Sequence, residues 1–391
     1  MSRPPDGLLL ARQRRLRAVM SALDVPALLT SDPIDIVYGC GARNMTVYGM
    51  MGPSRFLLLF ADGPSIVYEF AGGEHLAADL PTVDDVRSAP GITALSGPDH
   101  VHQLIHFARE VAAECRAAVG PGAVLAVERL DFEMTDALRA EGLTLHDATT
   151  LFVEARRLKQ PPELVAMREA VERVEAGVGQ LQASIVEGAS EVEVWAELHR
   201  ALIAGEGEYV STRLLQGGPN TFPYFNEAGS RRLEPGDLVC LDTDAVGFHG
   251  YAVDFSRTFH CGPGAATSRQ RDLHAKAWEQ LEHNAALLAP GRSYGDFVAR
   301  SWVLPEEHRS SAYYCLFHGL GLSGEHPTVL RPRDGGGPSL DGGLEPGMVV
   351  CVESYIGDPD THQGVKLEDQ YLVTETGTER LTTYPFDPAL T

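Results

Sequence analysis

Acidic residues recur at close spacing inside apolar segments, which is the pattern expected of a metal site. Asp242 and Asp244 lie two residues apart in one apolar run, and Asp254 lies in the next. On a β-strand, a spacing of two places both carboxylates on one face. Unpaired carboxylates in a cluster are unfavourable, because like charges repel and burial removes their water. A divalent cation is the simplest way to offset that repulsion.

A second pair of apolar segments repeats the pattern. Glu353 follows the apolar run 348–352, Glu368 lies within 364–373, and His318 precedes a glycine-rich stretch that lets the backbone approach a ligand. One such acid alone is more often a solvent-facing strand residue. Five acids with an imidazole predict a metal site, and this oxygen-rich donor set suits iron, manganese, zinc or cobalt without selecting among them.

The segments that carry these residues predict two β-hairpins. Strands are expected at 238–246 and 251–259 around a glycine-containing turn, and at 348–356 and 365–374 around a polar loop. A helix is expected between the pairs, at 268–288. Strands with intervening helices predict a mixed α/β (α+β) fold for this half of the chain.

The first part of the chain predicts a separate α/β domain. Helix signals at 8–23 and 102–118 alternate with short apolar strand signals. The prolines of Lys159-Gln-Pro-Pro disfavour helix just before them, and a long helical pattern begins at Glu163. We therefore predict a smaller N-terminal α/β domain at 1–157 and a catalytic domain at 158–391.

Charge and cysteine usage limit the partners and the compartment. The chain has 54 acidic and 32 basic residues, and its formal net charge of −22 disfavours a phosphate backbone as partner. No segment predicts a signal peptide or a membrane span. The six cysteines are scattered and lie mostly in apolar runs, which favours buried reduced thiols. We expect a cytoplasmic enzyme with a small-molecule substrate and neither a nucleic-acid nor a membrane partner.

Ordered motifs in residues 158–380 resemble the pita-bread family, which contains methionine aminopeptidase, Xaa-Pro aminopeptidase, prolidase and creatinase. The matching motifs are Lys159-Gln-Pro-Pro-Glu163, Glu234-Pro-Gly-Asp237, Asp254-Phe-Ser-Arg-Thr258, His318-Gly-Leu-Gly321 and Val365-Lys-Leu-Glu368-Asp. The resemblance implies a C-terminal pita-bread domain with two divalent metal ions. By that resemblance Asp254 and Glu368 bridge the ions, whereas Asp242, Asp244, His318 and Glu353 each bind one.

The sequence departs from the peptidases of this family at two imidazole positions. The peptidases carry a histidine seven residues after the ligand histidine, where this chain has Glu325, with His326 one residue further. The peptidase segment that ends in Pro-His continues here as Pro-Tyr224-Phe225. The two missing imidazoles argue against ordinary peptide cleavage.

The paired aspartates Asp242 and Asp244, the segment Pro-Tyr224-Phe225 and the motif His318-Gly-Leu-Gly321 are similar to those of one branch of the fold. Enzymes of that branch cleave dimethylsulfoniopropionate to dimethyl sulfide and acrylate by β-elimination. Tyr313 matches a tyrosine of that branch's substrate pocket. The branch's proposed base, an aspartate six residues after the ligand histidine, is Gly324 here. Asp244, Glu325 and His326 are therefore alternative catalytic candidates. Tyr224, Phe225 and Tyr313 could attract an onium group by cation–π contacts, and core packing explains them equally well.

We predict a metal-dependent, non-peptidase lyase for a small zwitterionic carboxylate such as dimethylsulfoniopropionate. The alternatives are an Xaa-Pro dipeptidase or aminopeptidase in which His326 takes the vacant role, and a creatinase-like or ectoine-type C–N hydrolase. The resemblance also implies a homodimer, in which Tyr48 of the smaller domain could reach a substrate bound by the second subunit.

Overall fold

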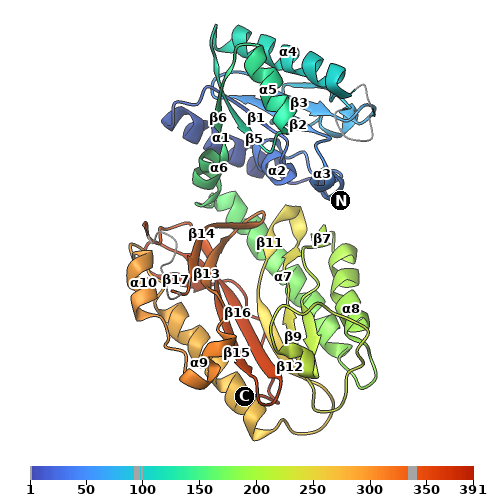
Figure 1. Cartoon of the computed structure of the whole chain (residues 1–391), viewed down its shortest axis with the longest axis vertical. Helices are drawn as coiled ribbons and strands as arrows, with labels where there is room; N and C mark the ends of the chain where they lie inside the picture. The colour runs from blue at the N-terminus through green and yellow to red at the C-terminus, as the bar shows by residue number, and fades with distance from the viewer. Residues whose placement is uncertain (1, 92–96, 98–99, 333–340) are drawn as a thin grey trace. The chain divides into compact units, whose positions relative to one another are not determined.

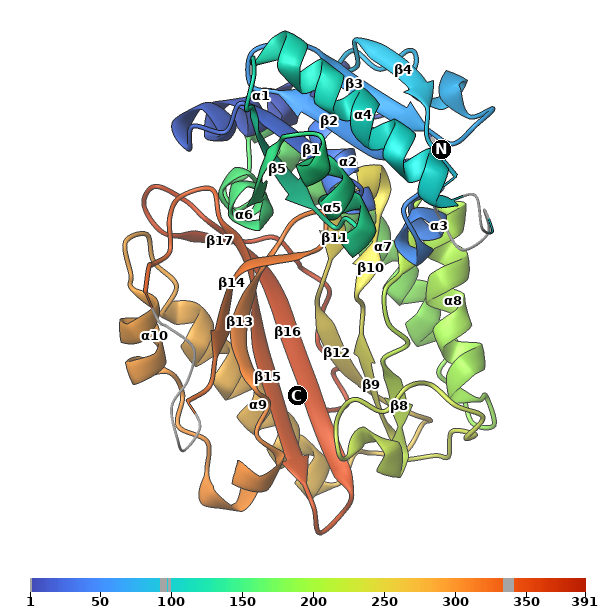
Figure 2. The same cartoon turned by 45° about the horizontal axis from the view of Figure 1, so that its top comes forward.

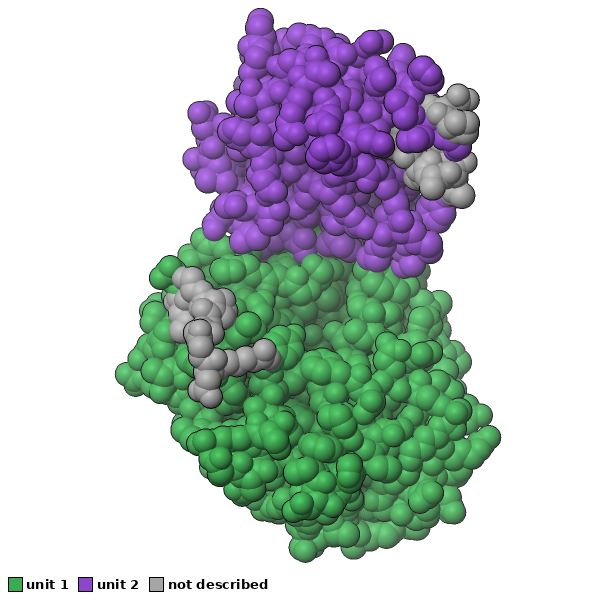
Figure 3. All heavy atoms as spheres, viewed as in Figure 1, with its two compact units in different colours: residues 1–2, 157–391 green, residues 3–156 purple. Residues whose placement is uncertain are grey.

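The computed structural model describes residues 2–91, 97, 100–332 and 341–391. The chain divides into two compact units, Arg3–Arg156 and, together with Ser2, Arg157–Thr391 (Figure 3). Both units combine helices with β-sheets (Figure 1), which confirms the predicted α/β class.

The N-terminal unit is a six-stranded mixed sheet with helices on its faces. Its strand order is β4-β3-β2-β1-β5-β6; the central β1 pairs antiparallel with β2 and parallel with β5. Side chains of α4 and α5 pack on one face of this sheet. The elements are α1 (Asp6–Ala22), β1 (Ala27–Thr30), α2 (Pro33–Cys40), α3 (Thr46–Met51), β2 (Phe56–Phe60), β3 (Ser65–Glu69), β4 (Asp85–Ser88), α4 (His100–Ala118), β5 (Val124–Glu128), α5 (Phe132–Ala140), β6 (Thr144–Asp147) and α6 (Thr149–Arg156).

The C-terminal unit is built on one large sheet with the strand order β14-β13-β15-β16-β12-β9-β8 and with β17 on β16 (Figure 2). The same unit contains a small second sheet with the strand order β11-β10-β7. The elements are α7 (Pro161–Ala183), α8 (Glu191–Ala204), β7 (Tyr209–Val210), β8 (Leu215–Gly217), β9 (Leu238–Asp242), β10 (Ala245–Val246), β11 (Ala252–Val253), β12 (Ser256–His260), α9 (Ser268–Ala286), α10 (Tyr294–Arg300), β13 (Cys315–Leu320), β14 (Gly324–Leu330), β15 (Val349–Asp358), β16 (Gln363–Val373) and β17 (Thr378–Arg380).

Alternation along β15 and β16 separates the hydrophobic core from a polar face. Val352 and Leu367 belong to the core cluster that includes residues of α9. Successive strand residues point to opposite faces, so Glu353 and Glu368 point away from that cluster. Both strands are buried almost throughout, and the polar side chains on the second face therefore need partners inside the protein.

The first predicted hairpin is broken where its acids lie. The strand expected at 238–246 ends at Asp242, and Ala245–Val246 joins the small sheet instead. Asp244 has a left-handed φ of 38°, which a continuous strand does not allow. At the break, the hydroxyl of Thr243 accepts a hydrogen bond from the amide of Phe255 at 3.0 Å. A turn therefore places Asp242 and Asp244, rather than the pleat of a regular strand.

The described helices include none that is long and apolar enough to cross a membrane. All six cysteines are buried and unpaired, as their apolar neighbours predicted.

His274 on α9 makes the stability of the fold depend on pH. Burial lowers its pKa to about 4 from the ordinary 6.5, so the folded state binds fewer protons than the unfolded state between these values. Stability is therefore full above pH 6.5 and falls as the pH drops, by about 2 kcal/mol at pH 5. We expect His274→Gln to remove this part of the difference between urea unfolding curves at pH 7 and pH 5. The exposed His283 of the same helix is the control, and an equal effect of His283→Gln would contradict the assignment.

Candidate metal centre

Neighbouring strands bring the predicted ligands together. Glu353 of β15 pairs directly with Glu368 of β16. On the other side, Ser256 of β12 pairs with both Glu368 and Asp242, the last residue of β9. Asp254 lies just before β12. The register of four adjacent strands thus gathers carboxylates that are distant in sequence.

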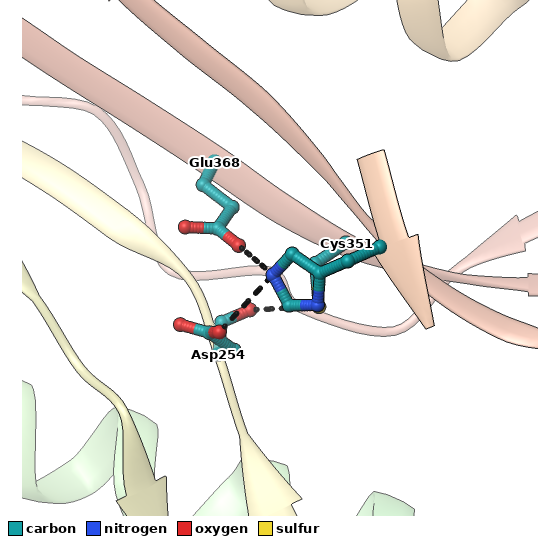
Figure 4. Close-up of side chains that lie close together, drawn as sticks. Asp254, Cys351 and Glu368 are labelled. Carbon is teal, nitrogen blue, oxygen red and sulfur yellow. Dashed lines mark hydrogen bonds and ion pairs between the residues drawn. The ribbon is translucent and has the colours of Figure 1, made fainter. Parts of the chain in front are cut away.

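The imidazole of His318 on β13 faces three of these carboxylates. Its Nε2 lies 3.3 Å from Oε1 of Glu353 and 3.5 Å from both Oδ2 of Asp254 and Oε1 of Glu368. In Figure 4 the carboxylates of Asp254 and Glu368 point toward the same imidazole nitrogen. Its Nδ1 lies 3.1 Å from the carbonyl oxygen of Gly319, which orients the ring. Burial alone would lower the pKa of His318, but hydrogen bonds to Glu353 and Glu368 raise it well above its usual value. Three oxygens thus surround one nitrogen.

A buried lysine, Lys366, is part of the same cluster. Its Nζ lies 2.6 Å from Oε2 of Glu353, 2.7 Å from Oε2 of Glu368 and 3.5 Å from Oδ2 of Asp242. Despite its full burial, the surrounding carboxylates raise its pKa well above the usual value. Sequence reasoning missed this residue. The signal was its position two residues before Glu368, which places both side chains on one face of the strand.

Hydroxyl groups hold the two remaining aspartates. The phenol of Tyr224 donates a hydrogen bond to Oδ2 of Asp242 at 2.6 Å, and Oγ of Ser256 lies 2.8 Å from Oδ1. The hydroxyl of Thr212 donates to Oδ2 of Asp244 at 2.6 Å. Burial, with the charge of Asp242, raises the pKa of Asp244 to about 7. Thr212 and Ser256 carry no sequence signal of their own, because isolated hydroxyl residues are common in loops and strands.

The donor set fits a divalent metal. Oδ1 of Asp254 is buried and makes no hydrogen bond within the described part of the chain. Burial and the charge of Glu368 raise the pKa of Asp254 well above its usual value. A buried carboxylate oxygen without a hydrogen-bond donor is unfavourable unless a cation binds it. Carboxylate oxygens with one imidazole are the donors preferred by manganese, iron, cobalt and zinc in proteins.

The hydroxyl of Tyr224 should strengthen metal binding through Asp242. Tyr224→Phe removes the hydrogen bond that orients this carboxylate, and we expect metal affinity to fall by about 10- to 100-fold, as for other residues that support ligands. Calorimetric titration of the metal-depleted protein with Zn²⁺ or Mn²⁺ measures this change. Tyr355→Phe is the matched control, because its hydroxyl donates to the backbone of Thr221 and not to an acid. Equal losses in both variants would contradict the role of the hydroxyl.

A cavity of about 600 Å³ opens over the cluster. Phe225, Tyr313 and Tyr314 are among its lining residues, and the rings of Phe225 and Tyr313 lie 5.5 Å apart. The predicted substrate-binding residue Tyr224 packs 5.5 Å from the ring of Tyr313 but does not line the cavity. The predicted site residues among its lining are Asp242, Asp244, Asp254, His318, Glu353, Phe225, Tyr313 and Glu325.

The structure separates the neighbours Glu325 and His326. Glu325 faces the cavity, but Oε2 of its carboxylate accepts from the buried Nζ of Lys159 at 2.6 Å. The exposed His326 points to the other side of β14, where its ring lies 6.1 Å from that of Tyr294. Tyr48 belongs to α3 of the N-terminal unit and is 43% exposed. Neither His326 nor Tyr48 is among the residues that line the cavity.

Comparison with known proteins gives the family. The model of metallopeptidase family M24 matches residues 165–375. The chain belongs to this family, and it is a metal-dependent enzyme. The predicted resemblance is thereby confirmed.

Two curated relatives match nearly the whole chain. Dimethylsulfoniopropionate lyase DddP of Roseovarius nubinhibens is 35% identical over 97% of this chain and 86% of its own length. DddP of Roseobacter denitrificans is 33% identical over the same shares. Among solved structures, an Xaa-Pro dipeptidase from Bacillus anthracis superposes with a TM-score of 0.77 over 97% of this chain and 98% of its own, at 20% identity. That likeness confirms the pita-bread fold.

Proposed function

We propose that this enzyme is a lyase that cleaves a small zwitterionic carboxylate by β-elimination, with dimethylsulfoniopropionate as the first candidate. The observation that carries the proposal is the state of the two imidazole positions. Tyr224 supports a metal ligand, and Glu325 is paired with Lys159. His326, the sequence neighbour of Glu325, is exposed and lies beside Tyr294 rather than in the cavity lining. The described cavity lining thus holds no histidine beyond His318 to assist peptide cleavage.

Two divalent ions are the proposed cofactor, and charge supports that number. The cluster contains five carboxylates, from Asp242, Asp244, Asp254, Glu353 and Glu368, and the ammonium of Lys366. With a neutral His318, two divalent cations bring the sum to zero, whereas one leaves two negative charges in a buried site. Uncompensated buried charge is strongly unfavourable. Iron, manganese, zinc and cobalt all remain compatible.

The chain's own residues supply the remaining steps of the elimination. Bound metal ions would act as Lewis acids that acidify the carbon next to the substrate carboxylate. Asp244 lines the cavity, and the hydroxyl of Thr212 holds one of its oxygens. We therefore assign Asp244 as the base that removes the α-proton. The electron pair of the broken C–H bond forms the C=C bond, and the sulfide leaves with the electrons of the C–S bond. Glu325 is the weaker candidate, because Lys159 stabilises its carboxylate as an anion.

The aromatic side of the cavity suits the cationic end of such a substrate. Phe225, Tyr313 and Tyr314 line the cavity that opens over the acidic cluster, and the ring of Tyr313 lies 5.5 Å from that of Phe225 and 5.0 Å from that of Tyr314. Each cation–π contact contributes about 0.5–2 kcal/mol, depending on how fully the cation loses its water. A sulfonium or quaternary ammonium group at this wall would place its carboxylate toward the metal ligands.

We also propose a cytoplasmic homodimer. Buried reduced cysteines support the compartment. Exposed apolar side chains on one segment of the N-terminal unit, Met45, Val47, Tyr48 and Met51, support a protein contact with a second copy. Light scattering of the wild type and of Met51→Glu tests the assembly, and a wild-type monomer at micromolar concentration would contradict it.

A substrate panel tests the lyase. Protein reconstituted with Fe²⁺, Mn²⁺ or Zn²⁺ should release acrylate from dimethylsulfoniopropionate or a related onium carboxylate, and a chelator should abolish the activity until metal is restored. Xaa-Pro dipeptides form the second arm. Cleavage of these dipeptides without any elimination product would replace the lyase by a peptidase, and release of urea or acetate from amide substrates would indicate a C–N hydrolase.

A further inference from the structure

A second cavity, of about 680 Å³, lies beside the metal cavity and shares Tyr313 and Tyr314 with it. The shared residues form a common wall. Its other lining residues come from α10, from the segment that follows α10 and from the two residues that follow β14. This cavity takes no part in the proposed elimination.

One cation in this second cavity, Arg331, has no acidic partner among the residues that the structure describes. Arg331 is half-buried, and within the described part of the chain its guanidinium makes one hydrogen bond, from Nε to the carbonyl oxygen of Tyr313 at 3.3 Å. Among the described arginines of Arg157–Thr391, only Arg331 and the exposed Arg271 have no carboxylate within 4 Å. The chain carries 22 more acidic than basic side chains, so an unpaired half-buried arginine is unexpected.

The physical chemistry of this arginine points to an anionic ligand. Burial lowers the pKa of Arg331, and no neighbouring acid counteracts that effect. A guanidinium that has lost part of its water is stabilised by a planar anion that accepts two of its N–H groups. Arg309 also lines the cavity, but Glu306 already pairs with it at 2.6 Å.

The rest of the lining selects among anions. Val298, Trp302 and Leu304 add apolar side chains to the lining of this cavity. Phosphate has no apolar part to bury there, whereas a short-chain carboxylic acid has both a planar head and an apolar body. We propose that this cavity binds a small monocarboxylate, of the size of acrylate or propionate, through Arg331. Binding there would reach the metal cavity through Tyr313, whose carbonyl contacts Arg331 and whose ring lines the active site.

Calorimetric titration of the metal-loaded protein with acrylate, propionate and phosphate tests the site at constant ionic strength. We expect a carboxylate-binding event that Arg331→Gln weakens by at least about tenfold, the loss typical of a hydrogen bond to a charged group. Arg271→Gln is the matched control and should leave the titration unchanged, because it removes an unpaired arginine outside the cavity. Phosphate should bind more weakly than either carboxylate.

Three results would overturn the proposal. They are equal carboxylate binding by the wild type and Arg331→Gln, equal loss in both arginine variants, and phosphate binding as tight as that of propionate. Fluorescence of Trp302 gives a second readout, since a ligand in this cavity should perturb that indole in the wild type alone. The acids are added directly, so the test stands even if the substrate panel shows no lyase activity.

Discussion

Gly324→Asp should raise the rate of acrylate release from dimethylsulfoniopropionate by about 100-fold or more, the usual contribution of a positioned general base. Gly324 stands where the similar lyase branch has its proposed base, and it lines the metal cavity. A β-carbon built on Gly324 meets no atom within 4 Å. A carboxylate at this position therefore meets no steric obstacle at the edge of the cavity. Initial rates of acrylate formation by the metal-loaded wild type and variant measure the effect.

Gly324→Asn separates basicity from shape. Asparagine has nearly the same size as aspartate but accepts no proton near neutral pH, so this control should leave the rate close to that of the wild type. If aspartate gave no more than asparagine, the proton would be removed elsewhere, and Asp244 would remain the assigned base. A wild type that prefers another onium carboxylate, with dimethylsulfoniopropionate favoured only after Gly324→Asp, would identify residue 324 as a determinant of specificity.

Lys366→Met should strongly destabilise the metal-free protein and have much less effect on the metal-loaded one. The ammonium of Lys366 contacts Glu353 and Glu368 in a fully buried site. Removing one partner of a buried ion pair destabilises a protein by about 3–5 kcal/mol, because the remaining charge is uncompensated. Metal ions that bind only the folded state raise the free energy of unfolding by mass action. Urea unfolding with a chelator and with excess Zn²⁺ measures the two values.

Two variants control for this effect. Lys366→Arg keeps the positive charge and should retain most of the stability of the metal-free protein. Lys276→Met breaks an ion pair with Asp272 on the surface of α9, and loss of such a pair costs about 0–1 kcal/mol. Equal destabilisation of the Lys366→Met variant with and without metal would mean that Lys366 acts by packing alone and does not balance the charge of the ligands.

The sequence predicted the acidic cluster and its histidine because their signal is local. Burial of an unpaired acid inside an apolar strand is unfavourable. Five such acids together with one histidine are therefore the pattern expected of a metal site. The alternation of apolar and polar residues along a strand is also a local signal, because a few consecutive residues suffice to show it. It assigns Val352 and Leu367 to the core and Glu353 and Glu368 to the opposite face, as the structure shows. The α/β class and the pita-bread fold follow from the same local patterns and the ordered motifs.

The partners of those ligands were decided by the tertiary structure, since they depend on contacts between distant segments. Lys159 meets Glu325 across 166 positions of sequence, and Thr212 reaches Asp244 across 32. A side chain's sequence neighbours do not reveal such an ion pair. The break after Asp242 could not be predicted from the sequence pattern either. Alternation alone predicts a continuous strand there, whereas the structure has a left-handed turn at Asp244.

The sequence by itself therefore determined which residues form the acidic cluster, as well as the fold that carries them. The pattern of acids within single apolar segments indicated the cluster, and the resemblance of the ordered motifs indicated the fold. Only the tertiary structure decided that Lys366 contacts the cluster, that Glu325 is paired while His326 faces away, and that Arg331 lines a second cavity without an acidic partner among the described residues. Strand register and the packing of remote segments determine these contacts.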